Sequence, residues 1–359
     1  MKTIPLILMG CGGVGRQLIQ HIVSCRSLHA KQGVLLRVVG VCDSKSVVVA
    51  SDVFTRGLDD AFLTEICRVK SSGSSLSILG SKGGECQIFS NLESVKKVVD
   101  IASHLGRTTG LTFVDCSASS ETIEILNQAV DLGCCIVLAN KKPLTSPMVG
   151  AGLPVITSLN RLLASGDPVH RIIGSLSGTL GYVMSEVEDG KPFSQVVTEA
   201  KCLGYTEPDP RDDLGGMDVA RKALILARLL GARLNLDDIK VESLYPAEMG
   251  PDKMSLEDFL SSGLSSLDEG IDERVKVASS KGNVLRYVCV IDGSRCHVGI
   301  QELPKDSPLG RLKGSDNVLE VYSRCYSKQP LVIQGAGAGN DTTAAGVLAD
   351  ILDIQDLFS

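Results

Sequence analysis

Hydrophobic positions in the first part of the chain predict strands that alternate with helices. Short, continuous apolar runs are typical of strands buried on both faces of a parallel sheet. Segments with apolar residues at helical spacing lie between these runs. The predicted strands cover residues 4–10, 34–41, 111–115 and 134–139, and the predicted helices include Leu18, Ile19 and Ile22 and span residues 121–130. This alternation predicts an α/β fold with a parallel sheet.

The later part of the chain mixes helices and strands in a different order, which favours an α+β architecture. Helices are predicted over residues 155–164, 194–203, 218–230 and 342–352. Strands are predicted over residues 171–176, 318–325 and 331–334, and a hairpin over 285–291 and 296–303. A serine- and glycine-rich stretch, 67–85, predicts a surface loop, and the prolines of 205–213 predict an ordered loop rather than a helix.

A glycine-rich turn follows the first predicted strand. The segment Gly10-Cys11-Gly12-Gly13-Val14-Gly15 fits the pattern G-x-G-x-x-G at the start of a predicted helix. Glycines allow a tight turn and a close approach of the backbone to a pyrophosphate, which the free N–H groups of the helix N-terminus attract. We therefore expect a dinucleotide site at Gly10, Gly12, Gly13, Val14 and Gly15. The alternative is a glycine turn with a structural role only.

Asp43, which follows the second predicted strand, bears on the choice of nucleotide. A carboxylate at this place accepts the ribose 2′-hydroxyl of NAD and repels the 2′-phosphate of NADP. Lys45 lies nearby in the sequence and favours the opposite preference. The sequence therefore leaves the choice between NAD and NADP open.

Composition and charge narrow the classes of function. The chain has 359 residues, 43% of them hydrophobic and 22% charged, which predicts about two globular domains. Its net charge of −6 argues against non-specific nucleic-acid binding, and no apolar run is long enough to cross a membrane. Because a strand begins almost at once, with no targeting segment before it, we expect a cytoplasmic protein.

The twelve cysteines and five histidines are scattered without the spacing of a zinc site or a disulfide framework. We expect most cysteines to be small core residues in a reducing compartment. Proton chemistry in such an enzyme would use lysine and carboxylates. A rival hypothesis is a thiolate mechanism at Cys116, which follows a predicted strand without a histidine motif to support it.

The densest polar segment is Tyr205-Thr206-Glu207-Pro208-Asp209-Pro210-Arg211-Asp212-Asp213. Asp218 and Lys222 come next, spaced to share one face of an otherwise apolar helix. A lysine at the start of a buried helix is partly desolvated, and neighbouring carboxylates tune such a lysine for proton transfer. The alternative is a structural Asp218–Lys222 ion pair.

Three further polar or glycine-rich segments follow predicted strands. Ser117 lies in a loop that is expected to face the cofactor crevice, and Lys141 lies at the end of a strand, where it would point towards a nicotinamide. The segment Gly335-Ala336-Gly337-Ala338-Gly339 forms a second turn from strand to helix. This turn either returns the chain to the first domain or has a structural role only.

Taken in order, these motifs resemble those of the stand-alone homoserine dehydrogenases over essentially the whole chain. The segment from Glu207 to Lys222 is the most specific, and the first glycine motif is the most generic. The matching segments are Gly10–Gly15, Asn140–Pro143, Val149–Pro154, Ser177–Leu180, Gly204–Asp213, Asp218–Lys222 and Gln334–Gly339.

The resemblance implies a Rossmann-type NAD(P)-binding domain over residues 1–147, completed by 334–359, and an α+β catalytic and dimerisation domain over 148–333. It implies reduction of L-aspartate 4-semialdehyde to L-homoserine with NADPH or NADH, on the route to threonine and methionine, by a homodimer. Its partners would be this small-molecule substrate and a second copy of the chain.

The resemblance also implies roles for individual residues. Lys222 matches the acid/base lysine, and Lys141 matches a second lysine at the nicotinamide. Glu207, Asp213, Asp218, Thr179 and Tyr205 match substrate-binding residues, Ser117 and Gly339 match cofactor contacts, and the backbone carbonyls of Val149, Ala151 and Leu153 match ligands of Na⁺ or K⁺.

One segment departs from the family pattern. Family members have a helix and a strand between the Asn-Lys-Lys and Val-Gly-Ala-Gly-Leu-Pro segments, where this chain has only residues 143–148. A parallel crossover needs about a dozen residues, so we expect both elements to be missing and a sheet edge to be left unpaired. No acidic residue directly precedes Val149, where the family has a carboxylate for the cation. The alternative function is therefore an inert, shortened variant that serves as a nucleotide-binding or dimer partner.

Overall fold

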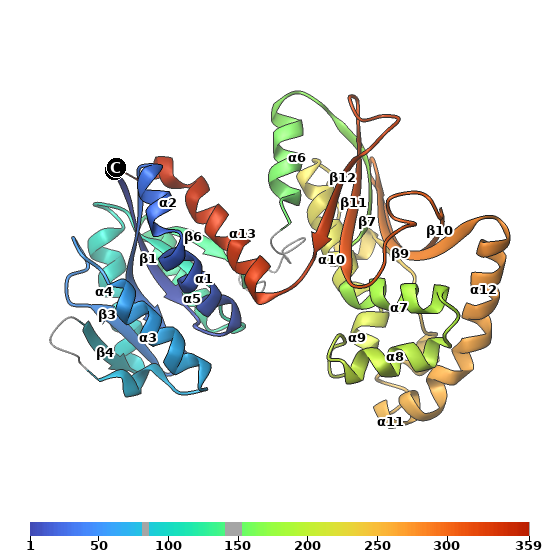
Figure 1. The fold of residues 1–359 in the computed structure, drawn as a ribbon, viewed down its shortest axis with the longest axis horizontal. Helices are drawn as coiled ribbons and strands as arrows, with labels where there is room; N and C mark the ends of the chain where they lie inside the picture. The colour runs from blue at the N-terminus through green and yellow to red at the C-terminus, as the bar shows by residue number, and fades with distance from the viewer. Residues whose placement is uncertain (81–85, 141–152, 359) are drawn as a thin grey trace. The chain divides into compact units, whose positions relative to one another are not determined.

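The computed structural model describes residues 1–80, 86–140 and 153–358, which separate into two compact units (Figure 1). The first unit combines Met1–Thr145 with Gly339–Ser359, and the second is Ser146–Ala338. Within these described ranges, each unit contains a six-stranded sheet. The assignment of residues 1–147 with 334–359 to nucleotide binding, and of 148–333 to catalysis and dimerisation, stays a prediction.

The sheet of the first unit has the strand order β4-β3-β2-β1-β5-β6. Strands β2, β1, β5 and β6 are parallel, as predicted, while β3 and β4 extend the sheet with antiparallel pairings. The chain passes from β1 to β2 on one side and later to β5 on the other, so the order reverses between β1 and β5. The bounds are β1 (Lys2–Met9), β2 (Val34–Cys42), β3 (Ser46–Ala50), β4 (Cys86–Ser90), β5 (Thr112–Asp115) and β6 (Cys135–Leu138).

Helices cover both faces of this sheet (Figure 1). Alternate side chains of β1 point to opposite faces, so Leu6 and Leu8 join one core cluster with α1, α3 and α13, while Ile7 and Met9 join another with α4 and α5. The bounds are α1 (Gly13–Ser24), α2 (Arg26–Lys31), α3 (Asp60–Ser71), α4 (Leu92–Leu105), α5 (Thr122–Asp131) and α13 (Asn340–Asp353).

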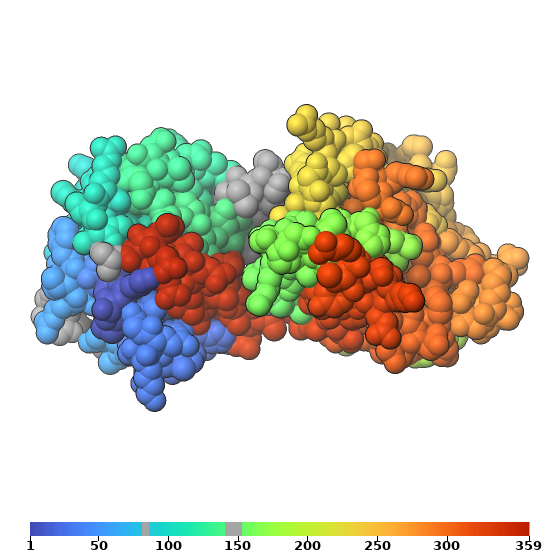
Figure 2. All heavy atoms as spheres, turned by 90° about the horizontal axis from the view of Figure 1, so that it is seen from above, coloured from blue at the N-terminus to red at the C-terminus, as the bar shows by residue number. Residues whose placement is uncertain are grey.

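The last helix returns to the first unit. Figure 2 shows α13, in red, against the blue N-terminal segment, and His21 of α1 lies 2.8 Å from the carboxylate of Asp341. The second glycine turn therefore does lead back to the unit that carries the first one.

The sheet of the second unit has the order β12-β11-β7-β9-β10-β8 and is antiparallel except for the pairing of β10 with β8. Strands β9 and β10 form the predicted hairpin, with Gly293 in the left-handed conformation at φ +57°. The bounds are β7 (Val169–Ser175), β8 (Lys240–Val241), β9 (Asn283–Asp292), β10 (Arg295–Pro304), β11 (Asp316–Ser323) and β12 (Leu331–Ala336).

One large core cluster joins this sheet to the helices of the second unit, and a smaller cluster packs Leu309 and Leu312 against Ile173, Val288 and Val318. Among the residues described, no helix combines the length and the hydropathy needed to cross a bilayer. The bounds are α6 (Val155–Ala164), α7 (Gly178–Glu188), α8 (Phe193–Cys202), α9 (Arg211–Leu214), α10 (Met217–Leu229), α11 (Leu256–Asp258) and α12 (Asp268–Ser280).

Two predictions about loops are wrong in part. The expected surface loop over 67–85 begins inside α3, which continues to Ser71, because Ile66, Cys67 and Val69 are buried on one face of that helix. The expected loop over 205–213 ends in the short helix α9, whose N-cap is Pro210. Proline is tolerated at the start of a helix, where its missing N–H has no intrahelical partner.

A buried arginine joins the loop over residues 305–314 to the sheet of the second unit. The Arg286 side chain is 1% exposed and lies 2.7 Å from the carboxylate of Glu188. Its guanidinium also donates to the backbone carbonyls of Leu309, Gly310 and Leu312. Because a buried guanidinium is costly without partners, these bonds fix the loop against β9.

We predict that Glu188→Gln lowers the free energy of unfolding at neutral pH by about 3 kcal/mol, because it breaks a buried ion pair. Burial alone would raise the pKa of Glu188, but its bonds to Arg286 and Lys313 hold that pKa below the usual value. The pair therefore stabilises the fold above the unfolded pKa of Glu188, and its contribution is lost as the pH falls through the folded pKa.

Urea denaturation at several pH values measures this difference. Glu302→Gln is the matched control, since Glu302 pairs with Lys281 at 3.0 Å where both side chains are well exposed, and such pairs contribute at most about 1 kcal/mol. Equal losses in the two variants would contradict the prediction.

Candidate active site

The glycine motif lies where the chain leaves β1, beside the point at which the strand order reverses. Ligands of open α/β sheets bind outside the carboxyl ends of the strands at such a point. Gly10 adopts φ +92°, and a Cβ on it would lie 2.7 Å from the backbone nitrogen of Ser117. The loop after β5 therefore packs directly on the turn after β1, as the prediction for Ser117 requires.

The remaining glycines of the motif have two different surroundings. A Cβ on Gly15 would overlap the carbonyl oxygen of Gly10, and one on Gly13 would overlap the amide of Asn340. A Cβ on Gly12, by contrast, would meet nothing within 4 Å. Gly12 is the N-cap of α1, so open space lies beside the free N–H groups of that helix. These residues fit a dinucleotide pyrophosphate.

The second glycine turn also reaches this place. Gly339, at φ +135°, is the N-cap of α13, and Asn340 at the start of that helix contacts Gly13 of the motif. The structure thus brings Gly339 close to the predicted nucleotide site, although the two segments lie far apart in the sequence. Asn340 was not predicted from the sequence.

A buried carboxylate organises the loops after β5 and β6. Asp115 is 0% exposed. It accepts bonds from the backbone N–H of Ser117 at 2.9 Å, the hydroxyl of Thr122 at 2.8 Å and the amide of Asn140 at 3.0 Å. Sequence analysis assigned no role to Asp115 or Thr122, and their only signal was a polar residue at the end of an apolar strand. This network fixes Ser117 and Asn140, the residue before Lys141.

The thiol hypothesis is disfavoured at Cys116. Burial, reinforced by the charge of Asp115, raises the pKa of the Cys116 thiol to about 12. A nucleophilic cysteine needs a lowered pKa and a thiolate at neutral pH. All the cysteines are free thiols, and burial also raises the pKa of Cys11, inside the glycine motif, to about 12.

Asp43 follows β2 as expected, and its side chain is only 5% exposed. Lys70 of α3 lies 3.0 Å from its carboxylate. The predicted ribose acceptor is therefore already part of an ion pair inside its own unit.

In the second unit, Thr179 and Asp213 shape the polar loop before α10. The hydroxyl of Thr179 donates to the backbone carbonyl of Tyr205 at 2.6 Å, and the backbone N–H of Glu207 donates to Asp213 at 2.8 Å. The ring of Tyr205 packs edge-on against Tyr182, with 5.1 Å between the ring centroids. The predicted residues Thr179, Tyr205, Glu207 and Asp213 thus lie together.

Lys222 is held by two acceptors on α10 and after β7. Its ammonium nitrogen lies 2.8 Å from the carboxylate of Asp218 and donates to the backbone carbonyl of Leu176 at 2.7 Å. The residue is 9% exposed and sits at the start of the apolar stretch of α10. An ammonium has three N–H donors, and these two bonds use two of them. Leu176 was not predicted as a site residue, since a backbone acceptor has no signal in the sequence.

The pKa of Asp213 is shifted by its neighbours in this group. Burial, together with the charges of Glu207 and Asp218, raises the pKa of the Asp213 carboxyl, against the lowering effect of its bond from the Glu207 N–H. Three carboxylates therefore act on one another electrostatically, and one of them, Asp218, pairs with Lys222. Such a surplus of negative charge attracts a ligand that carries a cation.

Some predicted site residues lie outside the described part of the chain. They are Lys141, Val149 and Ala151. Leu153, the third predicted cation ligand, is described, and its carbonyl oxygen accepts a bond from the N–H of Val155 at 2.7 Å. In the described residues, no group of His, Cys, Asp and Glu side chains is arranged to hold a metal ion.

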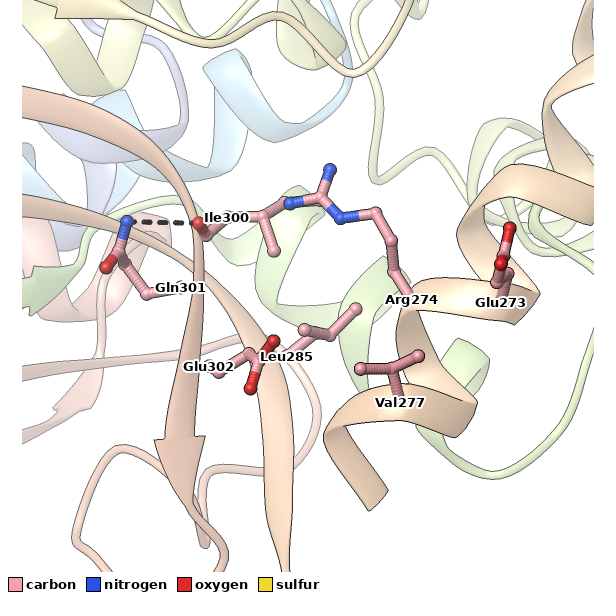
Figure 3. Close-up of a pocket in the computed structure, with 7 residues that line it drawn as sticks. All are labelled: Glu273, Arg274, Val277, Leu285, Ile300, Gln301 and Glu302. Atoms are coloured by element: carbon pink, nitrogen blue, oxygen red, sulfur yellow. Dashed lines mark hydrogen bonds between the residues drawn. The ribbon is translucent and has the colours of Figure 1, made fainter. Parts of the chain in front are cut away.

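The second unit also has a pocket with a different set of lining residues (Figure 3). It is a cavity of about 540 Å³ between α12 and strands β9 and β10, with Arg274, Glu273 and Glu302 among its lining residues. None of the residues that line it is a predicted substrate residue. We therefore place the candidate site at the carboxylate group and not at this cavity.

Comparison with known proteins gives a consistent set of relatives. A family profile described as homoserine dehydrogenase matches residues 154–352. A bifunctional aspartokinase/homoserine dehydrogenase of Haemophilus influenzae is 35% identical over 98% of this chain and 43% of its own length. A homoserine dehydrogenase of Paracoccidioides brasiliensis is 38% identical over 71% of this chain and 77% of its own length.

Two solved structures share the whole fold. A Candida auris protein of unknown function has a TM-score of 0.81 at 31% identity, over 100% of this chain and 99% of that one. A hyperthermophilic archaeal homoserine dehydrogenase in complex with NADPH has a TM-score of 0.69 at 22% identity, over 99% of both chains. The Rossmann-type domain with a second α+β domain, expected from the sequence, is thus confirmed.

The chain spans less than half the length of the bifunctional relatives that it matches, 43% for that of Haemophilus influenzae and 38% for one of Zea mays. The alignment with the former covers 373 positions, more than the 359 residues of this chain, so the chain lacks some positions of that relative. Their location between Pro143 and Val149 stays a prediction.

We predict opposite outcomes for alanine at two glycines of the motif. Gly12→Ala is expected to fold with an unchanged Tm and to bind NAD(P) at least tenfold more weakly, because its methyl group enters the open space beside α1. Gly15→Ala is expected to lower the Tm, since its methyl group overlaps the Gly10 carbonyl.

Thermal denaturation and calorimetric titration with NADP and NAD measure these effects. Nucleotide binding by Gly12→Ala at the wild-type affinity would contradict the placement of the pyrophosphate.

Proposed function

We propose that this chain, which belongs to the homoserine dehydrogenase family, reduces L-aspartate 4-semialdehyde to L-homoserine with a reduced nicotinamide nucleotide. The observation that carries the proposal is the Lys222 ammonium, held by the Leu176 carbonyl and by Asp218, a carboxylate that acts electrostatically on Asp213. The motifs that resemble the family extend through the described parts of both units.

The carboxylates account for recognition of the substrate. L-Aspartate 4-semialdehyde and L-homoserine both carry an α-ammonium group. Glu207 and Asp213 lie together, and within the described residues neither forms an ion pair with a cation. Their mutual repulsion contributes to the raised pKa of Asp213. An ammonium group between them would relieve this repulsion and form charge-assisted hydrogen bonds.

Lys222 accounts for the proton. When bound, the nicotinamide supplies a hydride to the aldehyde carbon, and negative charge develops on the carbonyl oxygen. The remaining N–H of Lys222 can donate to this oxygen, stabilise its charge and transfer a proton to it. Asp218 and Leu176 hold the ammonium in place, so little reorganisation is needed at the moment of reaction. The second lysine of the proposal is Lys141.

The finer parts of the proposal rest on the family resemblance. They are the homodimer, the Na⁺ or K⁺ ion at the carbonyls of Val149, Ala151 and Leu153, and the cytoplasmic location. The competing function is an inert, shortened chain that binds a nucleotide or serves as a dimer partner. This alternative is tested directly because the chain lacks some positions of the Haemophilus influenzae relative.

We predict that Lys222→Ala lowers kcat about a hundred- to ten-thousand-fold, the usual range for the loss of a general acid or base. The affinity for nucleotide should stay close to wild type, since Lys222 lies outside the unit that carries the glycine motif. Homoserine-dependent reduction of NADP and NAD, followed by nicotinamide absorbance, measures turnover, and calorimetry measures the affinity.

Lys276→Ala is the matched control. Lys276 forms the same i,i+4 pair with an aspartate, Asp272, but on the surface of α12, where the lysine is 74% exposed. Turnover should not change. Parallel loss of turnover and nucleotide affinity in Lys222→Ala would make the Asp218–Lys222 pair structural. A folded wild-type protein that binds nucleotide without any turnover would establish the inert variant instead.

We predict that Asp213→Asn weakens homoserine binding roughly tenfold or more without destabilising the fold. Because the folded pKa of Asp213 is raised, its ionisation disfavours the folded state as the pH rises above the unfolded pKa, and this penalty is absent in acid. Asparagine keeps an acceptor for the Glu207 N–H without the charge. The Tm at neutral pH should therefore be equal or higher.

KM for homoserine and thermal denaturation at neutral pH test both parts. A lower Tm with an unchanged KM would show that Asp213 serves the fold and not the substrate.

A further inference from the structure

Both oxygen atoms of the Asp43 carboxylate accept hydrogen bonds from residues of the same unit. Its Oδ1 atom accepts the backbone N–H groups of Lys45 and Ser46 at 2.9 Å each, and the Ser46 hydroxyl at 3.0 Å. These bonds close the turn between β2 and β3. They occupy the side of the carboxylate that faces its own turn.

The other oxygen joins this turn to α3 and the segment after it. Oδ2 accepts the Lys70 ammonium at 3.0 Å, the Ser75 hydroxyl at 3.2 Å and the Leu76 N–H at 2.8 Å. A carboxylate has about four acceptor sites, so these donors saturate Asp43. A ribose hydroxyl would have to displace one of them.

The ionisation of Asp43 agrees with a structural role. Burial alone would raise its pKa, but the N–H bonds from Leu76 and Lys45 and the bond from Lys70 lower the pKa to about 2. Its charge is therefore always present at neutral pH and is matched by Lys70 at 3.0 Å. The Asp43–Lys70 pair leaves little net negative charge to repel a phosphate.

Two further cations at this end of the sheet, Lys45 and Arg16, have no carboxylate partner among the described residues. Lys45 is exposed in the turn directly after Asp43, and within the described residues it forms no ion pair. Arg16 of α1 donates to the Gly12 carbonyl at 3.2 Å and to the Ser71 hydroxyl at 2.7 Å, and the described part of the chain offers it no carboxylate. Arg16 and Lys70 both lie within electrostatic reach of the Cys11 thiol in the glycine motif.

We propose that the nucleotide site selects NADP(H) over NAD(H), with Lys45 and Arg16 binding the ribose 2′-phosphate and Asp43 acting as a structural clasp. This inference rests on the proposed function only in that a dinucleotide binds at the glycine motif. A phosphate monoester carries a charge of about −1.5 to −2 at neutral pH, which complements two unmatched cations. The proposal assigns the discrimination between the two nucleotides, which the sequence left open, to these residues.

Calorimetric titration of the full chain with three adenosine probes tests the proposal without turnover. Adenosine 2′,5′-bisphosphate is expected to bind roughly tenfold more tightly than 5′-AMP, or better, the usual range for new hydrogen bonds to a charged group. 2′-Deoxy-AMP is expected to bind like AMP, because the Asp43 carboxylate is already saturated and does not accept the 2′-hydroxyl. The preference for the bisphosphate should fall as the salt concentration rises from about 0.01 M to about 1 M.

A pair of charge reversals tests the residues. Lys45→Glu is expected to abolish the preference for the bisphosphate while AMP binds as before. Lys31→Glu is the matched control, since Lys31 is an exposed lysine before the amino end of the same strand, β2, and the change in net charge is identical. Both substitutions are on the surface, so both proteins should fold.

Three results would overturn the inference. They are equal or tighter binding of AMP by the wild type, markedly weaker binding of 2′-deoxy-AMP than of AMP, and an unchanged preference in Lys45→Glu. Failure of the proposed function has a different signature. If the chain prefers the bisphosphate but shows no homoserine-dependent turnover, the NADP(H) selectivity stands and the proposed enzymatic function fails. If the chain turns over homoserine but prefers NAD, the enzymatic function stands and the NADP(H) selectivity fails.

Discussion

The bonds of the Lys222 ammonium are the constraint on which the second unit's polar cluster depends. A buried ammonium is costly unless it is paired, and this one is satisfied by a backbone carbonyl just after β7 and a carboxylate one turn earlier on α10. Strand and helix are therefore held in a fixed relation. Asp218, whose position is set in this way, in turn acts electrostatically on Asp213 of the loop before α10.

The first unit follows the same rule with opposite charges. Asp115 ends β5 and Asp43 directly follows β2, the two strands on either side of β1. Both carboxylates are buried, and each is saturated by hydroxyl, amide or ammonium donors. Buried charges that are fully satisfied organise the protein and are not available to ligands. Among the charges that we propose for ligand binding, Glu207 in the second unit and Lys45 in the first are exposed.

Much of this arrangement could be predicted from the sequence. Parallel strands, the hairpin of β9 and β10 and the buried face of α10 follow from hydrophobic spacing, which reports burial directly. The role of Asp43 could not be predicted, because its position after β2 is the same whether its oxygens face a ribose or the backbone of residues 45–76. The anchoring of Lys222 by Leu176 and the contact of Asn340 with Gly13 were also missed. Both join segments that are distant in sequence and use backbone atoms or a common polar side chain, which leave no pattern.

The return of α13 to the first unit has a consequence for biosynthesis. This helix contributes Ala344, Val347 and Ile351 to the core cluster that contains Leu6 and Leu8 of β1. A ribosome that adds roughly 5–20 residues per second therefore completes the second unit while the first still lacks one wall of its core. For an interval on the order of tens of seconds, the nascent chain exposes the apolar side of β1 and α1. Of the two units, the one whose first strand is synthesised earlier is therefore the last to close, and its apolar surface stays accessible to chaperones in the meantime.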